Sequence, residues 1–477
     1  MSKKGWTTVS LGDIASWSSG GTPKSTNSKF YNGDIPWIVI GDLNDSYVEN
    51  SKKSITEEGL ENSSAKLVKP GSLLIGMYGS IGKLGIAKKK LTTNQAIAFT
   101  QRIYGNIPVK FLFYFILYKR EYLLSIGKGG AQQNISQAVL KNVKISLPPL
   151  NEQKRIANKL DQAFLHIDSL QNRLNTIPEL LKQFRKMILQ KAVSGELTSN
   201  WRKANTRTAS TYLKELQELK LIKAKNKKQI EDINSSFNIS IRKPFDINET
   251  WDFVKLDCLV NKLSYGTSAK SNESGEVPVL RMGNIQNGSI DWGNLKYSSN
   301  DSEINKYLLK KGDLLFNRTN SAELVGKTAI YRGERKAIYA GYLIRIDVVP
   351  NVSSEYLNFV LNSSYGREWC ELVKTNTAGQ SNINAQKLSN FMVPIPHIDE
   401  QQEIVKHVSE LFRFADQVES KFNKTKHQLD TLPQQLLIKA FRGELVAQDP
   451  NDESAEKLLE QIKQEIENLK RTKKKSK

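Results

Sequence analysis

Cysteine and histidine are both scarce in this sequence of 477 residues. Only Cys258 and Cys370 are present, and they do not form the close pairs that hold zinc or exchange disulfides, so we expect neither a disulfide framework nor a metal site. Three of the four histidines lie on or beside long periodic segments, away from any carboxylate cluster. We interpret them as exposed helix residues rather than as ligands or catalytic bases.

Long apolar runs are also absent. The most apolar stretch, 111–118, is shorter than the roughly 20 residues that span a bilayer, and it is followed by Lys119 and Arg120. We predict a buried helix there. The first residues carry no apolar stretch typical of an export signal. The sequence therefore favours a cytoplasmic protein with no membrane contact.

Motifs for catalysis are missing as well. The segment 76–84 resembles a phosphate-binding loop, but Met77 occupies the place of the first glycine and Leu84 follows the lysine where Ser or Thr should hold magnesium. The Asn/Asp-Pro-Pro-Tyr tetrapeptide of adenine-N6 methyltransferases does not occur, and we find no glycine-rich cofactor loop or nuclease carboxylate cluster. We therefore expect a binding protein that has no catalytic residues and no cofactor of its own.

Acidic residues are outnumbered by basic ones. Lysine and arginine total 70 against 49 for aspartate and glutamate, which gives a formal net charge of +21. This surplus favours a polyanionic partner, of which nucleic acid is the commonest. Charge alone also serves solubility and nonspecific binding, so it does not separate a sequence-specific protein from a basic scaffold.

What the sequence does contain is a repeat of about half its own length. Asn134-Ile135 recurs as Asn382-Ile383 at an offset of 248 residues, and Glu152-Gln153 recurs as Glu400-Gln401 at the same offset. Earlier in each copy the offset is 241 to 245 residues, which indicates small insertions in loops. Because the repeat is far longer than the period of solenoids, we expect two similar domains with pseudo-twofold symmetry.

Each copy has the texture of a mixed fold. Short apolar runs such as 37–40, 72–75 and 96–99 are separated by Gly, Asn, Ser and Pro, which predicts short strands joined by long polar loops. The segments 110–126 and 355–373 predict helices. The fold class expected for each globular domain is therefore α+β.

A long helix is predicted after each domain, starting near Asn151 and Asp399. Apolar residues then alternate at spacings of four and three over more than four heptads, as in a coiled coil. The predicted seam includes Ile156, Leu160, Ile167, Leu170 and Leu174 in the first helix, and Ile404, Val408, Leu411, Val418 and Phe422 in the second. We favour pairing of the two helices over separate helices lying on their own domains. Pro178 and Pro433 predict a kink or a break in each.

Polar loops containing glycine recur at matching positions in the two copies. Backbone amides and lysines contact phosphates, while Gln and Asn can recognise an adenine edge in the major groove. The DNA-binding residues that we predict in the first copy are Thr22, Lys24, Tyr78, Ser80, Lys83, Lys128, Gln132, Gln133 and Asn134. In the second copy they are Thr267, Ser268, Arg281, Asn317, Arg318, Thr319, Asn320, Lys327, Gln380 and Asn382. Ordinary turn chemistry is the alternative for each loop taken singly.

Arg318 is the single strongest prediction, as a bidentate contact to a guanine or to a phosphate. The domain boundaries expected from these patterns are 1–150 for the first globular domain, 151–200 for the first long helix, 201–250 for a basic and partly helical linker, 251–396 for the second globular domain, 397–447 for the second long helix, and 448–477 for a terminal helix with a basic tail.

With these segments in view, the sequence resembles the DNA specificity subunit of type I restriction–modification systems. The resemblance covers 6–445 and depends mainly on 131–153, 317–327 and 439–445. Two variable target-recognition domains, each followed by a more constant helix, are the organisation of that family. The resemblance implies that the helices pair as an antiparallel coiled coil.

The function implied by the resemblance is recognition of a split double-stranded DNA site, with one half-site for each domain and the paired helices setting the gap. Two methylation subunits, which bind S-adenosylmethionine and methylate adenine at N6, would bind the chain. Two restriction subunits using ATP and magnesium would complete a nuclease for phage defence. The chain itself would catalyse nothing. The rival function is a nonspecific basic nucleic-acid-binding scaffold.

Overall fold

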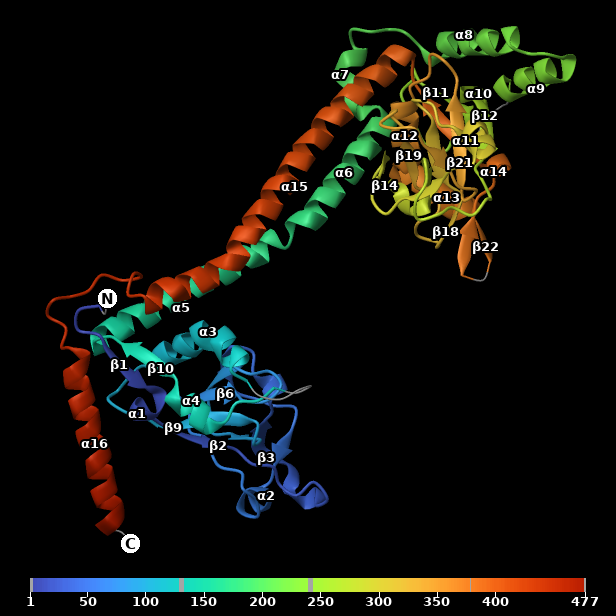
Figure 1. Cartoon of the computed structure of the whole chain (residues 1–477). Helices are drawn as coiled ribbons and strands as arrows, with labels where there is room; N and C mark the ends of the chain where they lie inside the picture. Colours follow the sequence, from blue (N-terminus) through green and yellow to red (C-terminus); the bar gives the residue numbers. More distant parts are fainter. Residues whose placement is uncertain (1–2, 128–132, 239–242, 378, 476–477) are drawn as a thin grey trace. The chain divides into compact units, whose positions relative to one another are not determined.

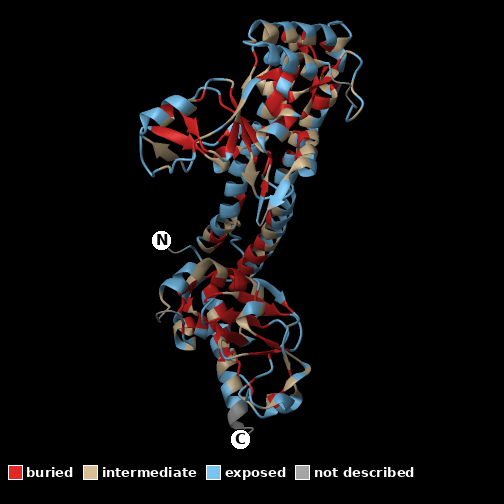
Figure 2. Ribbon diagram, turned by 90° about the vertical axis from the view of Figure 1, so that its right-hand side faces the viewer, coloured by how far each residue is buried: buried red, intermediate tan, exposed pale blue. Residues whose placement is uncertain are grey.

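The computed structural model describes residues 3–127, 133–238, 243–377 and 379–475. The chain divides into two compact units: unit 1 is Met1–Asn175 with Asn423–Lys477, and unit 2 is Thr176–Phe422. Each unit contains one globular domain and segments of the long helices (Figure 1). Buried residues are concentrated inside the domains and recur along the long helices (Figure 2).

The domain of unit 1 is built on a five-stranded sheet in the order β2-β9-β6-β7-β4. Its strands are β2 (Ala15–Ser19), β9 (Ile97–Ile103), β6 (Leu73–Gly76), β7 (Leu84–Ala87) and β4 (Ser46–Val48). All neighbours are antiparallel except β4 and β7. A smaller sheet contains β5 (Ser54–Ile55), β3 (Tyr31–Ile38) and β8 (Thr92–Thr93). The domain begins and ends on one antiparallel pair, β1 (Thr7–Ser10) with β10 (Lys144–Leu147).

The helices of this domain include the apolar run singled out in the sequence. That run lies in α3 (Val109–Ser125), where Phe111 through Ile116 are buried in the core. Shorter helices are α1 (Leu11–Ile14), α2 (Glu57–Glu61), α4 (Gln137–Asn142), η1 (Ser28–Phe30) and η2 (Ile40–Asp42). In the part of the chain that the structure describes, no helix is both long and apolar enough to cross a membrane.

Unit 2 repeats the main sheet with four strands in the order β12-β21-β17-β19. They are β12 (Val260–Tyr265), β21 (Leu343–Val348), β17 (Leu314–Asn317) and β19 (Thr328–Ile330), all antiparallel to their neighbours. The domain again begins and ends on one antiparallel pair, β11 (Asp252–Lys255) with β24 (Met392–Ile395). The expected α+β class therefore holds for both domains.

Smaller elements complete unit 2. The strands are β13 (Val277–Leu280), β16 (Lys296–Ser298) and β20 (Ile338–Tyr339) in one sheet, β14 (Ile285–Gln286) with β15 (Ser289–Ile290), and β18 (Thr319–Asn320), β23 (Gln380–Asn382) and β22 (Thr375–Thr377) in another. The helices are η4 (Met282–Asn284), α10 (Leu256–Leu259), α11 (Asp301–Tyr307), α12 (Ser354–Asn362), α13 (Ser364–Val373) and α14 (Ala385–Ser389). The single helix predicted over 355–373 is thus two, because Ser363 caps the second one by accepting from the Gly366 amide.

The long helices are α5 (Leu150–Leu174) in unit 1, α6 (Ile177–Ser194) in unit 2, and α15 (Ile398–Phe441), which contributes residues to both. The predicted break at Pro178 is present, since this proline lies in the first turn of α6, where its missing N–H costs nothing. No break occurs at Pro433, because α15 continues through it. Beyond that proline, Leu437 and Ala440 are buried in the core of unit 1, and this packing offsets the lost hydrogen bond.

The long helices run antiparallel to one another, as the resemblance implied. In unit 1, Ile156 near the start of α5 shares a core with Leu437 near the end of α15. In unit 2, Ile188 near the end of α6 shares a core with Ile404 near the start of α15. These cores also include residues of the globular domains, so the stripes pack on their own domains as well as on each other.

The predicted seam is only partly buried. Its buried members are Ile156, Leu160, Ile167, Ile404, Val408 and Phe422, and its half-buried members are Leu174, Leu411 and Val418. Leu170 is 48 % exposed, so including it in a buried seam was wrong. A straight α-helix has 3.6 residues per turn, and a stripe with a period of 3.5 therefore rotates away from its partner by about 20° per heptad.

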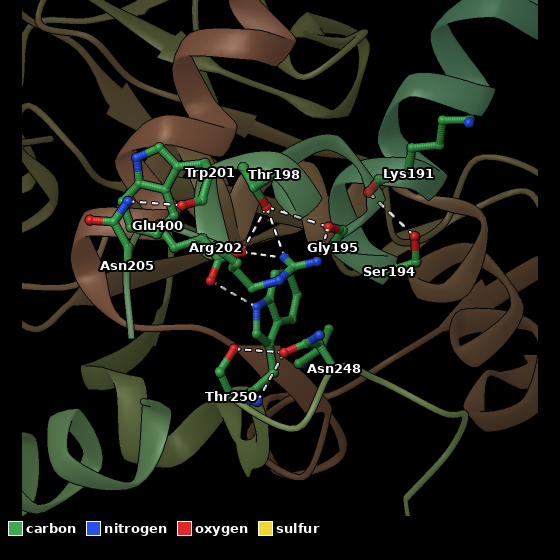
Figure 3. Close-up of polar contacts among 12 residues, drawn as sticks. Lys191, Ser194, Gly195, Thr198, Trp201, Arg202, Asn205, Asn248, Thr250 and Glu400 are labelled. Carbon is green, nitrogen blue, oxygen red and sulfur yellow. Dashed lines mark hydrogen bonds and ion pairs between the residues drawn. The ribbon is translucent and has the colours of Figure 1, made fainter. Parts of the chain in front are cut away.

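A buried carboxylate connects three segments of unit 2. Glu400, the third residue of α15, is 2 % exposed, and its carboxylate accepts hydrogen bonds from the Trp251 indole (3.0 Å) and the Thr198 hydroxyl (2.6 Å). It also forms an ion pair with Arg202, which donates to the Gly195 carbonyl at 2.7 Å. Figure 3 shows the side chains of Arg202 and Thr198 converging on Glu400. The end of α6, the start of the domain and the start of α15 are therefore held together.

Unit 1 keeps the indole bond but not the ion pair. Glu152, the third residue of α5, is fully buried and accepts from Trp6 at 3.1 Å and from Gln448 at 3.4 Å. Within the described residues its Oε1 has no hydrogen-bond partner. The nearby ion pair joins Arg155 to Asp452 at 2.6 Å instead. The repeat thus preserves the tryptophan–glutamate contact and changes its surroundings.

The repeat also includes a further helix after α6 and after α15. Unit 2 contains η3 (Glu196–Thr198), α7 (Ser199–Arg202), α8 (Ala209–Ile222) and α9 (Lys227–Phe237), and unit 1 contains α16 (Ala455–Lys475). The first residue of α8 donates its amide to the Thr250 carbonyl (2.8 Å), and that of α16 donates to the Gly5 carbonyl (3.0 Å). Each of these carbonyls belongs to the residue directly before the tryptophan that contacts the buried glutamate, Trp6 in unit 1 and Trp251 in unit 2. The buried residues have equal spacing: Ala209, Tyr212 and Leu216 in α8, and Ala455, Leu458 and Ile462 in α16.

The helix packing predicts unequal effects along the stripe. Ile404→Ala should lower the free energy of unfolding by about 2–5 kcal/mol, because it leaves a cavity in the core of unit 2. Leu170→Ala is the matched control and should leave stability near wild type, since that side chain is half exposed. Urea unfolding followed by circular dichroism measures both. Equal losses in the two variants would contradict the observed burial.

The buried ion pair predicts a second contrast. Arg202→Met leaves the Glu400 carboxylate buried without its cation and should cost about 3–5 kcal/mol of stability. The control is Arg207→Met, since Arg207 pairs with Asp399 in a largely exposed position and its loss should hardly move the unfolding transition. Thermal unfolding of the two variants tests this. A stable Arg202→Met protein would show that the pair does not hold the three segments together.

Candidate nucleic-acid interface

The predicted loops lie at one edge of the main sheet in each unit. In unit 1, β2 and β6 end where the antiparallel strand β9 begins, so the loops after β2 and β6 lie together. In unit 2, β12 and β17 end where β21 begins. We call these surfaces the loop edges: 20–24, 77–83 and 133–134 in unit 1, and 265–268, 318–327 and 380–382 in unit 2.

The third segment of each loop edge joins through backbone pairing. In unit 1, Tyr78 pairs with Asn134, and the Gly79 amide donates to the Gln133 carbonyl at 3.0 Å. In unit 2, Thr319 pairs with Asn382 through β18 and β23, and the side-chain amide of Asn382 donates to the Thr319 hydroxyl at 2.7 Å. Segments more than 50 residues apart in the sequence therefore meet at equivalent places in the two units.

A glycine allows the first loop to leave each sheet. A Cβ atom on Gly20 would overlap the carbonyl oxygen of Thr93, and one on Gly266 would overlap that of Tyr339. The backbone therefore crosses directly over its neighbour, which only glycine permits. This close approach sets the positions of the exposed residues Thr22 and Ser268 that follow.

Most of the predicted residues in unit 1 are accessible at the loop edge. Tyr78 is 45 % exposed, and Lys83 is half-buried. The Thr22 hydroxyl donates to the side-chain carbonyl of Gln95. The other exposed members are Lys24, Ser80, Gln133 and Asn134. Lys128 and Gln132 lie outside the described residues.

The loop edge of unit 2 is organised around Arg318. Its guanidinium carbon lies 4.6 Å from the centre of the Tyr265 ring, and its backbone amide donates to the Tyr342 carbonyl at 3.0 Å. Thr319, Asn320 and Asn382 are half-buried beside it, while Ser268 and Gln380 are exposed. Arg281 is half-buried and donates to the Asn294 carbonyl at 2.8 Å.

Two of the predicted contacts are turned inward. Thr267 is buried, where its hydroxyl donates to Glu303 and accepts from the Ala269 amide. Asn317 is fully buried and donates to the Leu324 carbonyl. Both side chains stabilise their loops, so a direct DNA contact for either was wrong: a polar side chain in a loop serves the loop's own backbone as readily as a ligand.

Lys327 faces away from the open part of the loop edge. Its amine donates to Gln286 at 3.0 Å, beside a cavity of about 590 Å³ that α6 and α15 also line within unit 2. Burial, and then the charge of Arg367, lower the pKa of Lys327. A partly desolvated cation in this position is not aimed at a ligand on the loop edge.

Two tyrosines, one in the unit 2 loop edge and one beside it, were not among the predicted DNA-binding residues. Tyr265 is 42 % exposed and Tyr342 is 51 % exposed, and each is adjacent to a glycine at a strand end. Large aromatic side chains on a polar loop surface are suited to stacking on bases or on arginine. The pairs Tyr265-Gly266 and Gly341-Tyr342 were the available sequence signal.

The two cysteines are remote from this chemistry. Both are buried, and burial raises the pKa of Cys258 to about 12 and that of Cys370 to about 11, so neither is a reactive thiolate at neutral pH. Among the described residues, no group of three or more His, Cys, Asp or Glu side chains could hold a metal ion. The loop edges offer hydrogen-bond donors, acceptors and stacking surfaces, which are binding groups.

This duplicated arrangement matches a known family. The model of the type I restriction modification DNA specificity domain matches residues 3–179 and again 248–425. The chain belongs to this family. The resemblance identified from the sequence is therefore confirmed, and the rival function of a nonspecific basic scaffold is not favoured.

Individual relatives agree with this assignment. The chain is 32 % identical over 360 residues to the EcoKI type I restriction enzyme specificity subunit of Escherichia coli (strain K12), covering 72 % of this chain and 69 % of that protein. It is 28 % identical over 490 residues to the StySPI specificity subunit of Salmonella potsdam, covering 97 % and 96 %. Members of this kind are specificity subunits, which supports a non-catalytic role for the chain.

Solved structures share the fold. The crystal structure of the HsdS subunit from Thermoanaerobacter tengcongensis superposes with a TM-score of 0.58 at 16 % identity, covering 93 % of this chain and 98 % of that one. A chain from a study of complex assembly and conformational transition of the type I R-M system gives a TM-score of 0.60 at 16 % identity, covering 93 % and 100 %. At this identity the likeness shows the fold alone.

The close approach at Gly266 predicts a local defect. Gly266→Ala should cost about 1–3 kcal/mol of stability and displace the first loop of the unit 2 loop edge, because the new methyl group meets the backbone of Tyr339 and Ala340. Gly283→Ala is the control, since a Cβ there meets nothing within 4 Å. Chemical denaturation and DNA binding by each variant measure the effect. Wild-type behaviour of Gly266→Ala would mean that the loop takes another path.

Proposed function

We propose that this specificity subunit recognises a split double-stranded DNA site, with each loop edge contacting one half-site. The observation that carries the proposal is the recurrence of the loop edge at equivalent strand ends in both units, with exposed hydroxyl, amide and aromatic groups in each. In functional terms, 1–150 and 251–396 are the recognition domains, 151–200 and 397–447 are the spacers, and 201–250 and 448–477 are connecting segments.

The contacts divide into two chemical kinds. Lys24 and Lys83 in unit 1 supply positive charge for phosphates, within a chain whose net charge is +21. Gln133 and Asn134 in unit 1, and Gln380 and Asn382 in unit 2, carry the amide groups that can recognise an adenine edge. The phosphate contacts position the protein, and the amides give sequence preference.

The paired helices act as the spacer in this proposal. The helix α15 has 44 residues and contributes to both units, and 1.5 Å per residue gives it a length of roughly 65 Å. Two half-sites recognised from one face of a duplex lie about one turn apart, roughly 10 bp. The length and stiffness of α15 would therefore set a constant gap between the half-sites.

The partners follow from the family. Two methylation subunits, which bind S-adenosylmethionine and methylate adenine at N6, would bind this chain, and two restriction subunits using ATP and magnesium would complete the nuclease. We place the complex in the cytoplasm, where it defends the cell against phage DNA. This chain would contribute specificity and scaffolding and no catalytic group.

Co-expression of this chain with the methylation subunit of the same restriction–modification system tests the function. The expected result is N6-methyladenine throughout the host genome in a two-part motif with a constant gap, and co-purification of the two proteins. Sequencing of methylated bases measures the motif directly. Random methylation, or none together with failure to co-purify, would overturn the proposal.

Competition between duplexes separates the proposal from nonspecific binding. A specificity subunit keeps a sequence-dependent part of its affinity in excess competitor DNA, whereas a scaffold loses binding equally to any duplex. Incubating the purified chain with DNA, S-adenosylmethionine, ATP and magnesium is the control for catalysis. Methylation or cleavage without another protein would contradict the non-catalytic role.

A further inference from the structure

We infer that the loop edge of unit 2 contains a guanine-binding site, made by Arg318 held against Tyr265, and that unit 1 has no equivalent. The inference rests on the proposed function and names a base that one half-site contains. It decides between the two ligands, guanine and phosphate, that the sequence left open for Arg318.

The backbone of Arg318 is fixed on both sides. Its amide donates to the Tyr342 carbonyl at 3.0 Å, and its carbonyl accepts from the Ile383 amide at 2.9 Å. These partners come from the residue before β21 and the residue after β23. The Cα atom from which the side chain extends is therefore held in one position.

The guanidinium group is also held in place. It stacks on the ring of Tyr265 with 4.6 Å between the guanidinium carbon and the ring centre. The Tyr265 hydroxyl accepts from the amide of Ala385 at 3.0 Å, which anchors the ring at the start of α14. A rigid aromatic platform of this kind orients the arginine fork without using its donors.

The donors of Arg318 are poorly satisfied. Its Nε is buried and has no hydrogen-bond partner within the described residues. Its Nη1 donates to the Gly341 carbonyl at a long 3.4 Å. A desolvated donor without an acceptor is costly, so the fork is arranged to gain acceptors from a ligand.

Guanine fits this fork better than a phosphate does. Its O6 and N7 are two coplanar acceptors at the major-groove edge, and a bidentate arginine is their commonest partner. The partly buried guanidinium, held over the Tyr265 ring, can present its donors in few directions, which suits two coplanar acceptors. A phosphate needs no such fixed direction and can be bound by a flexible cation on the surface. Asn382 and Thr319, hydrogen-bonded to each other at 2.7 Å, lie in the same edge segments and provide amide and hydroxyl groups for the adjacent base.

At the aligned positions, which the structure describes, unit 1 has neither part of the site. Aligning the end of β6 with the end of β17 places Met77 where unit 2 has Arg318, and Met77 is buried. Aligning Gly20 with Gly266 places Ser19 where unit 2 has Tyr265. The two half-sites are therefore recognised by different chemistry, and arginine-to-guanine recognition of this kind belongs to one of them.

The chain contains a matched control. Arg335 stacks on Trp292 with 4.5 Å between the guanidinium carbon and the ring, the same arrangement as Arg318 on Tyr265. Arg335 follows β19, which ends at the opposite strand ends of the sheet from the loop edge. A substitution there removes an arginine–aromatic stack of equal chemistry without touching the proposed site.

The experiment uses the full chain assembled with its methylation subunit. Arg318→Lys keeps the charge and loses the fork, Arg318→Ala loses both, and Tyr265→Ala loses the platform. We expect Arg318→Lys and Arg318→Ala to lower discrimination for guanine at one position of one half-site by about 10- to 100-fold. Tyr265→Ala should weaken discrimination at the same position, and Arg335→Lys should leave the motif unchanged. Methylation mapping and competition with duplexes substituted at each position measure these effects.

The outcomes separate this inference from the proposed function. If the wild-type complex methylates a split motif and Arg318→Lys leaves every position unchanged, the guanine site is wrong and the proposed function stands. A uniform loss of binding to all duplexes would assign Arg318 to a phosphate and overturn the inference. Absence of any split motif in the wild type would overturn both the guanine site and the proposed function. Circular dichroism of Arg318→Lys, the variant that keeps length and charge, confirms that a changed motif comes from a folded protein.

Discussion

The structure depends on a hydrogen bond between the tryptophan that opens each domain and the glutamate that opens each long helix. Trp6 donates to Glu152 in unit 1, and Trp251 donates to Glu400 in unit 2. Both carboxylates are buried in the first turn of a helix, where the helix dipole favours negative charge. The contact brings the first strand of the domain to the start of the helix, and so determines where every loop lies relative to that helix.

The helical part of the fold was accessible from the sequence because periodicity is a local signal. The repeat, the two helix starts and the break at Pro178 all follow from residue spacing and the positions of prolines. The expected cap by Asn151 was wrong, because α5 begins one residue earlier, after Pro149, and has no side-chain cap. Leu170 was assigned wrongly because burial depends on how far two helices remain in register, which spacing alone does not contain. The equivalence of α8 and α16 was missed because it depends on which domain each helix packs against.

The loop edges were predictable as segments and less so as side chains. Glycine, proline and polar residues mark loops, and matching offsets in two copies indicate which loops share a role. Thr267 and Asn317 have the same composition as their exposed neighbours, yet their side chains bond inward. The role of the Tyr265 side chain was missed because it comes from contact with Arg318, which lies 53 positions away in the sequence (318 − 265) and is brought close only by the fold.

The chain enters and leaves each domain through one antiparallel strand pair, β1 with β10 in unit 1 and β11 with β24 in unit 2. The two ends of the domain are therefore adjacent, and everything between them forms a self-contained insert. Under the proposed function, genetic exchange of such an insert would replace the bases recognised in one half-site while the helices that set the gap stayed the same. The architecture thus lets new specificities arise by shuffling intact cassettes rather than by accumulating point substitutions.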